Sequence, residues 1–156
     1  MPGLDVSRLS PADAVAALRS YPRRFHEVLT SVEPDLLPVD AIDEADHVAR
    51  SVALLGEALR QVLVQDEPTL MPGVADDGRR EWTMSASSSL DDVLAFLGME
   101  CNALADAVGN VPADAWTRTG TVAGTGEAMS ALAIVREAVR TGADHRHAAE
   151  RCVQSR

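Results

Sequence analysis

The 156 residues include 24 acidic and 14 basic side chains, which gives a formal net charge of −10, and 46% of them are hydrophobic. This charge argues against nucleic acid as a partner, because phosphate recognition needs clustered basic side chains. No apolar run approaches the roughly 18 residues that span a bilayer, so we expect no membrane partner. The length favours one domain over residues 1–156, and the first residues lack the features of a signal peptide, which favours a cytoplasmic protein.

The first predicted helix begins at Ser10, a good N-cap that is followed by Pro11 at the first helical position. Apolar residues at helical spacing continue to Val32, and Pro34 helps to end the helix. Pro22 lies in the middle of this stretch. Because proline lacks the N–H that a helix interior uses, we expect it to kink the helix or to break it in two.

A second amphipathic stretch runs from about Asp40 to Val64. His47 lies one residue away from the centre of its apolar stripe, on an edge that also carries Ser51 and Leu54. The pattern therefore places His47 at the boundary between core and solvent.

Helical periodicity stops between residues 65 and 88, a segment with two prolines, two glycines and a serine run. A structureless link of this length is unusual inside a compact domain and is often functional. It is long enough to cross a bundle, so the helices on either side of it can run parallel. We interpret its acidic runs, DEPTL and ADD, as solvated, and Trp82 as an anchor against the bundle or, as the less favoured alternative, a wall of a pocket.

The third predicted helix begins at the N-cap Ser89 and ends near Val108. VPADAW then predicts a single turn, and a segment rich in Gly and Thr leads to the last helix. Strand signals are absent from the pattern. The sequence therefore predicts an all-α four-helix bundle with a long crossover between the second and third helices.

The last amphipathic stretch covers residues 128–153 and carries two of the four histidines. His145 shares an apolar face with the small residues Ala138 and Gly142, whereas His147 points to the polar side. Residues this small leave a hollow beside His145. A histidine in such a hollow either satisfies a hydrogen bond in the core or lines a site.

Two segments carry a resemblance to a known family. DHVARSVALLGEALRQVLVQDEPTL at residues 46–70 and VPADAWTRTG at residues 111–120 resemble actinobacterial members of the DinB/YfiT-like superfamily. That group includes mycothiol-dependent transferases and the N-terminal domain of mycothiol-dependent maleylpyruvate isomerase. The resemblance covers nearly the whole chain. It implies a four-helix bundle, a homodimer, and zinc or nickel held by three histidines, one from the second helix and two from the fourth.

The resemblance carries over two of these ligands, His47 and His145. Thr141 stands where it implies the other histidine of the fourth helix, and Asp144 and Glu100 are the alternatives that we considered for a third ligand. The expected pocket lies between the second and fourth helices, and its lining is Thr141, Gly142, Ser51, Leu54 and Ala138.

Three functional hypotheses follow. The leading one is a metal-dependent transferase or isomerase that uses mycothiol or another low-molecular-weight thiol, because a metal-bound thiol is deprotonated at neutral pH and becomes a nucleophile. The second is a metal-free bundle of the same fold that binds a small molecule, or catalyses without metal, in the same cleft. The third is a dimeric interaction protein whose histidines are satisfied locally.

Overall fold

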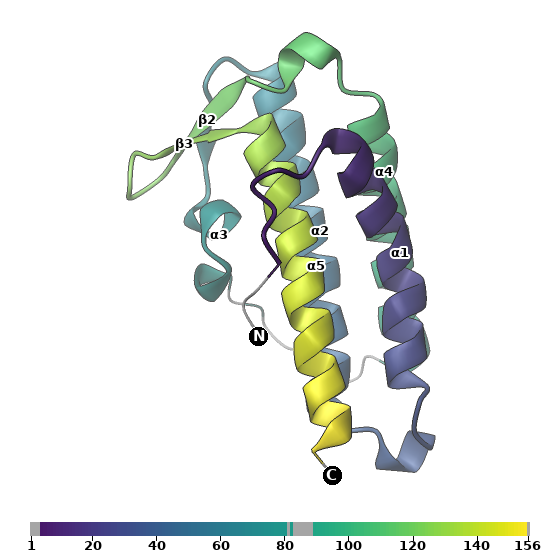
Figure 1. The fold of residues 1–156 in the computed structure, drawn as a ribbon. Coiled ribbons are helices and arrows are strands. Elements are labelled where there is room, and N and C mark those ends of the chain that lie inside the picture. The colour runs from purple at the N-terminus through teal and green to yellow at the C-terminus, as the bar shows by residue number, and fades with distance from the viewer. Residues whose placement is uncertain (1–3, 81, 83–88, 156) are drawn as a thin grey trace.

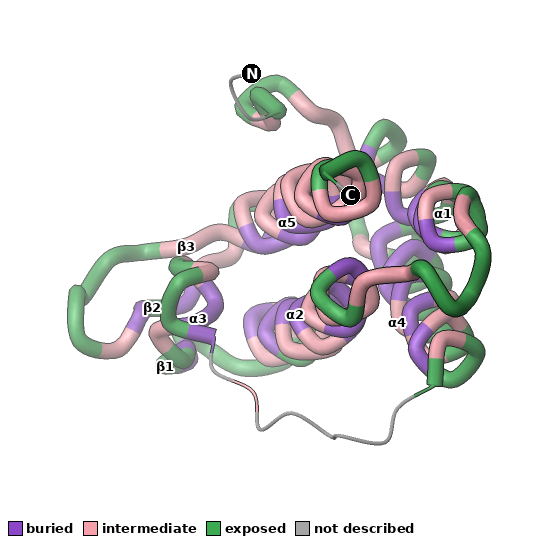
Figure 2. The backbone as a smooth tube through the Cα atoms, turned by 90° about the horizontal axis from the view of Figure 1, so that it is seen from below, coloured by how far each residue is buried: buried purple, intermediate pink, exposed green. Residues whose placement is uncertain are grey.

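Four long helices form a bundle in the computed structural model, which describes residues 4–80, 82 and 89–155 (Figure 1). They are α1 (Pro11–Leu29), α2 (Val39–Val64), α4 (Leu90–Gly109) and α5 (Ala131–Gln154). Helix α2 packs against α4 and α5, and α1 packs against the same two helices from the other side. Figure 2, a view from below, shows α1 and α2 at opposite corners. The predicted four-helix bundle is confirmed.

The helix directions confirm the predicted crossover. In Figure 1, α2 and α4 both run upward from their first residues, whereas α1 and α5 run downward. The neighbours α2 and α4 are therefore parallel, and the described part of the chain between them, residues 65–80 and 82, returns along the bundle. We call the whole segment 65–88 the crossover. Its residues 81 and 83–88, which include the serine run, lie outside the described part of the chain.

The described part of the crossover is ordered into short elements, contrary to our expectation of a structureless link. It contains strand β1 (Thr69–Leu70), helix α3 (Pro72–Ala75) and the 3-10 turn η2 (Asp77–Arg79). Strand β1 pairs in parallel with β2 (Thr119–Val122), and β2 pairs antiparallel with β3 (Ala128–Ser130). The expected absence of strands was wrong, because strands of two to four residues are too short to show an alternating pattern.

Most predicted helix boundaries are confirmed. Ser10 and Asp13 form a reciprocal capping box at the start of α1, and Ser89 caps α4. Helix α1 continues through Pro22, so the alternative of a broken helix was wrong. Pro22 lacks the N–H for one helical hydrogen bond, but buried residues before and after Pro22 pack in the core and keep the helix continuous. Residues 128–130, predicted to be helical, form β3, and α5 begins after its N-cap Ser130.

A tyrosine fills the hollow that the sequence predicted beside Gly142. A Cβ at this position would lie 2.6 Å from Cζ and Cδ2 of Tyr21, and the Tyr21 hydroxyl donates a hydrogen bond of 2.6 Å to the Val139 carbonyl. Gly142 and Ala138 are fully packed inside the bundle and leave no room for a ligand there. None of the described helices combines the length and the apolarity needed to cross a membrane.

Candidate metal centre

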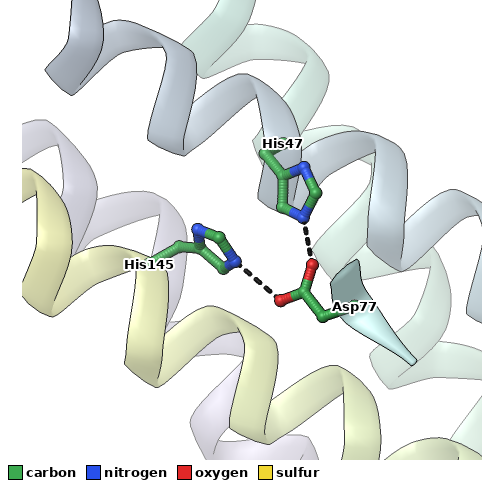
Figure 3. A group of neighbouring side chains, drawn as sticks. All are labelled: His47, Asp77 and His145. Atoms are coloured by element: carbon green, nitrogen blue, oxygen red, sulfur yellow. Dashed lines mark hydrogen bonds and ion pairs between the residues drawn. The ribbon is translucent and has the colours of Figure 1, made fainter. Parts of the chain in front are cut away.

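Three side chains from distant parts of the chain meet at the side of the bundle (Figure 3). His47 comes from α2, His145 from α5, and Asp77 from η2 in the crossover. Asp77 Oδ1 lies 2.5 Å from His47 Nε2, and Asp77 Oδ2 lies 2.7 Å from His145 Nε2. One ligand atom from each residue lies within 4.8 Å of the others, so the three residues could hold a metal ion. We call them the triad.

The outer ring nitrogens of both histidines are also engaged. Glu44, one turn before His47 on α2, pairs with Nδ1 of His145. Trp82 donates a hydrogen bond of 2.8 Å from its indole N–H to Nδ1 of His47. A carboxylate on the outer nitrogen fixes the tautomer and the orientation of a metal-binding histidine and makes it a better ligand. Glu44 therefore orients the His145 ring, with Nε2 turned toward Asp77.

Charge is concentrated at the triad. Burial disfavours the charged form of His145, but hydrogen bonds to Asp77 and Glu44 outweigh burial and raise its pKa to about 9. Burial alone would raise the pKa of Asp77, yet hydrogen bonds from His145 and His47 hold that pKa well below its usual range. The metal-free form thus carries a protonated His145 between two carboxylates.

Arg80 anchors the crossover beside the triad. Its side chain is fully buried, and its guanidinium donates to the Gly73 carbonyl over 2.5 Å, to Thr141 Oγ1 over 3.0 Å and to Glu137 over 2.6 Å. The same group lies 3.8 Å from Asp77 Oδ1. Because these partners belong to both the crossover and α5, Arg80 joins the two and holds Asp77 next to His145.

The donor set of the triad fits a divalent metal. Two imidazole nitrogens and one carboxylate suit zinc and nickel as well as other first-row metals. Ligation requires each Nε2 to give up its proton. On His145, Glu44 can keep the Nδ1 proton. On His47, the bond from Trp82 leaves Nδ1 as an acceptor and places the proton on Nε2, so metal binding requires the other tautomer and the loss of the Trp82 bond.

None of the other expected site residues is a member of the triad. Thr141 is buried, where it accepts the bond from Arg80 and donates to the Glu137 carbonyl over 2.8 Å, so it binds the crossover. The Ser51 hydroxyl is buried without a hydrogen-bond partner among the described residues. Leu54 lines a cavity of about 180 Å³ together with Trp82, and it is the one residue of the expected pocket in that lining.

The two alternatives for a third ligand point elsewhere. Asp144 pairs with Arg140 over 2.7 Å, and Glu100 lines a groove between α2 and α4. The third member of the triad is Asp77, in the acidic run that we interpreted as solvated. The run is too short and irregular for periodicity to show which of its carboxylates turns inward.

Glu44 had a detectable signal that we missed. It lies three residues before His47, on the same helical edge as His47 and Ser51, so the spacing that singled out His47 also places Glu44 beside the site. Arg80 had no such signal in the sequence. In a segment without periodicity, the sequence does not distinguish a buried arginine from an exposed one.

Comparison with family models finds no match, and neither does comparison with curated proteins. The chain is similar in structure to YfiT from Bacillus subtilis, with a TM-score of 0.72 and 14% sequence identity over 99% of this chain and 90% of that one. That protein is described as a probable metal-dependent hydrolase with an unusual four-helix bundle topology. The likeness shows a shared fold and agrees with the DinB/YfiT-like bundle that the sequence predicts.

Proposed function

We propose that this chain is a divalent-metal-dependent enzyme whose ion is held by His47, Asp77 and His145. The observation that carries the proposal is the convergence of three ligand atoms within 4.8 Å from α2, the crossover and α5. Glu44 pairs with the outer nitrogen of His145, as carboxylates commonly do with the histidine ligands of metal sites. The description of YfiT as a probable metal-dependent hydrolase supports the same class of chemistry.

A bound divalent ion lowers the pKa of a coordinated water or thiol and so supplies a nucleophile at neutral pH. The residues of this chain orient and tune that centre. Asp77 contributes the negative charge, Glu44 holds the Nδ1 proton of His145, and Arg80 keeps Asp77 in place.

Two sources of the nucleophile are compatible with this centre. The resemblance in sequence favours a thiol such as mycothiol, which makes the enzyme a transferase or isomerase. The likeness to YfiT favours water, which makes it a hydrolase. We propose the thiol-dependent reaction as the finer assignment. The homodimer and the cytoplasmic location stay predictions from the sequence.

The test is an activity panel on the full chain loaded with zinc or nickel. One arm measures hydrolysis of activated esters and amides, and the other measures consumption of a thiol with a small electrophile. We expect turnover in one arm that requires metal and is lost in His47→Ala and Asp77→Asn, while Asp76→Asn keeps it. Equal turnover in the metal-free chain or in Asp77→Asn would exclude the proposed role of the triad.

Failure of both arms together with absence of metal binding would favour the second hypothesis, a metal-free bundle that binds a small molecule. In that case the hydrogen bonds among Asp77, His47 and His145 are structural, and their role is to hold the crossover against α2 and α5.

A further inference from the structure

A second cavity lies between α1, α5 and the segment that precedes α1. Its volume is about 700 Å³, and no member of the triad lines it. In Figure 1 the segment before α1 passes over α5, on a different side of that helix from α3. Cavities that bind small molecules commonly measure about 300–1,000 Å³, so this one has the size of a ligand site.

Arginine side chains from two helices meet at this cavity. Arg24 from α1 and Arg146 and Arg151 from α5 line it. Among the ion pairs of the described residues, none includes Arg24 or Arg151. In a chain with a net charge of −10, two unpaired arginines beside one cavity are a local excess of positive charge that suits an anion.

The carboxylates at the cavity leave this excess largely in place. Asp5 and Asp144 also line it. Asp144 is already paired with Arg140 over 2.7 Å, and Asp5 accepts a hydrogen bond of 2.9 Å from the backbone N–H of Ser7. Neither carboxylate pairs with Arg24 or Arg151 in the described part of the chain.

Arg146 provides an independent indication of a ligand. Its Nε is buried and has no hydrogen-bond partner among the described residues, while its Nη1 pairs with Glu150. A buried donor on a charged group is costly when it has no acceptor, so such atoms call for an explanation. Water does not reach this Nε in the present arrangement, so an oxygen of a bound anion would supply the missing acceptor only after the guanidinium, which is partly exposed, turns toward the cavity.

Tyr21 lies near two of these arginines. Burial raises the pKa of Tyr21 to about 12; the positive charges of Arg24 and Arg146 oppose that rise, and the charge of Asp144 adds to it. The Tyr21 ring also lines the cavity and offers an apolar wall next to the two guanidinium groups.

We infer that this cavity binds a small organic anion, namely a carboxylate or phosphate group joined to an apolar body. The planar forks of arginine match the oxygens of either group, and the Tyr21 ring with Ala17 faces the apolar part. This site is separate from the triad and does not depend on the proposed function.

Calorimetric titration of the full, metal-stripped chain tests the inference, because removing metal prevents an anion from binding at the triad instead. The probes are benzoate and phenyl phosphate, with uncharged benzyl alcohol as the control ligand. We expect saturable binding of one anion per chain and no binding of benzyl alcohol. Arg24→Gln and Arg151→Gln should each weaken binding about tenfold, the effect of losing one charge-assisted hydrogen bond.

Arg23→Gln is the matched control, since Arg23 adjoins Arg24 on α1 but pairs with Glu27 and does not line the cavity. Asp77→Asn should leave anion binding unchanged, which separates this site from the triad. Absence of saturable binding would overturn the inference. So would equal weakening in Arg23→Gln, or loss of anion binding in Asp77→Asn.

Discussion

Arg80 donates a hydrogen bond of 3.0 Å to Thr141, a residue 61 positions further along the chain. The bond joins the crossover to α5 inside the protein, where both side chains are buried. It also explains why Thr141 adjoins the centre without being a ligand. Its hydroxyl holds the arginine that keeps Asp77 next to His145, so the crossover supplies the third member of the triad.

Thr141→Val should therefore weaken both the fold and the metal site. Valine keeps the shape but leaves a buried donor of Arg80 without its acceptor, which costs about 1–3 kcal/mol of unfolding free energy. Metal affinity should fall as well, because Asp77 is held less firmly. Urea unfolding and a zinc titration measure the two effects.

The control for this variant is Thr30→Val, which removes an exposed hydroxyl that bonds only within its own helix. It should change the unfolding free energy by less than about 0.5 kcal/mol. If Thr141→Val behaves like Thr30→Val in both measurements, Arg80 does not position Asp77 through this bond.

Glu44→Gln should lower metal affinity by about 10- to 100-fold while the fold is kept, because the variant removes the charge that orients His145. The pKa of His145 in the metal-free chain should fall below its value of about 9. Competition with a chromogenic chelator gives the affinity, and NMR titration gives the pKa. Asp43→Asn, at the preceding position on α2, is the control, and equal effects in the two variants would contradict the role of Glu44.

The metal-free chain should lose stability as the pH rises from neutral. The pKa of His145 is raised to about 9 in the folded chain, compared with about 6.5 for an unfolded histidine, so the folded state holds the proton more tightly. This contribution is complete below about pH 6.5 and is lost as the pH rises through about 9. Urea midpoints measured across this range should fall in the unmodified chain and fall less in His145→Gln. Parallel curves for the two proteins would refute the raised pKa.

The bundle could be predicted from sequence because its signals are regular. Long apolar stripes and the capping residues Ser10 and Ser89 gave four helices with boundaries that mostly held. The length of the crossover gave the parallel order of α2 and α4. The small sheet left no such trace, because its strands are only two to four residues long.

The candidate site was predictable only where its residues lie on long helices. His47 and His145 stood out against the periodicity of α2 and α5, and the structure brings them together. Asp77 is positioned by the buried Arg80 rather than by any repeat, so its local sequence does not distinguish it from its exposed neighbour Asp76. The hollow at Gly142 was a wrong expectation for a related reason, since Tyr21, which fills it, comes from another helix.

Gly142→Ala tests that packing directly. The added methyl group would overlap the Tyr21 ring, and overpacking of this kind costs about 1–3 kcal/mol of unfolding free energy. Gly56→Ala in α2 is the matched control, because its added Cβ lies 4.0 Å from the nearest side-chain atom, and it should stabilise the chain by about 0.5–1 kcal/mol. Thermal unfolding compares the stability of both variants with that of the unmodified chain. A Gly142→Ala variant as stable as the unmodified chain would show that the space beside Gly142 is open.

The central claim is that His47, Asp77 and His145 hold a metal ion, and elemental mass spectrometry of the purified, untagged chain tests it most directly. We predict about one zinc or nickel per chain after incubation with either metal, lost in His47→Ala, His145→Ala and Asp77→Asn and retained in the neighbouring Asp76→Asn. Absence of metal from the unmodified chain, or full occupancy in Asp77→Asn, would contradict the claim.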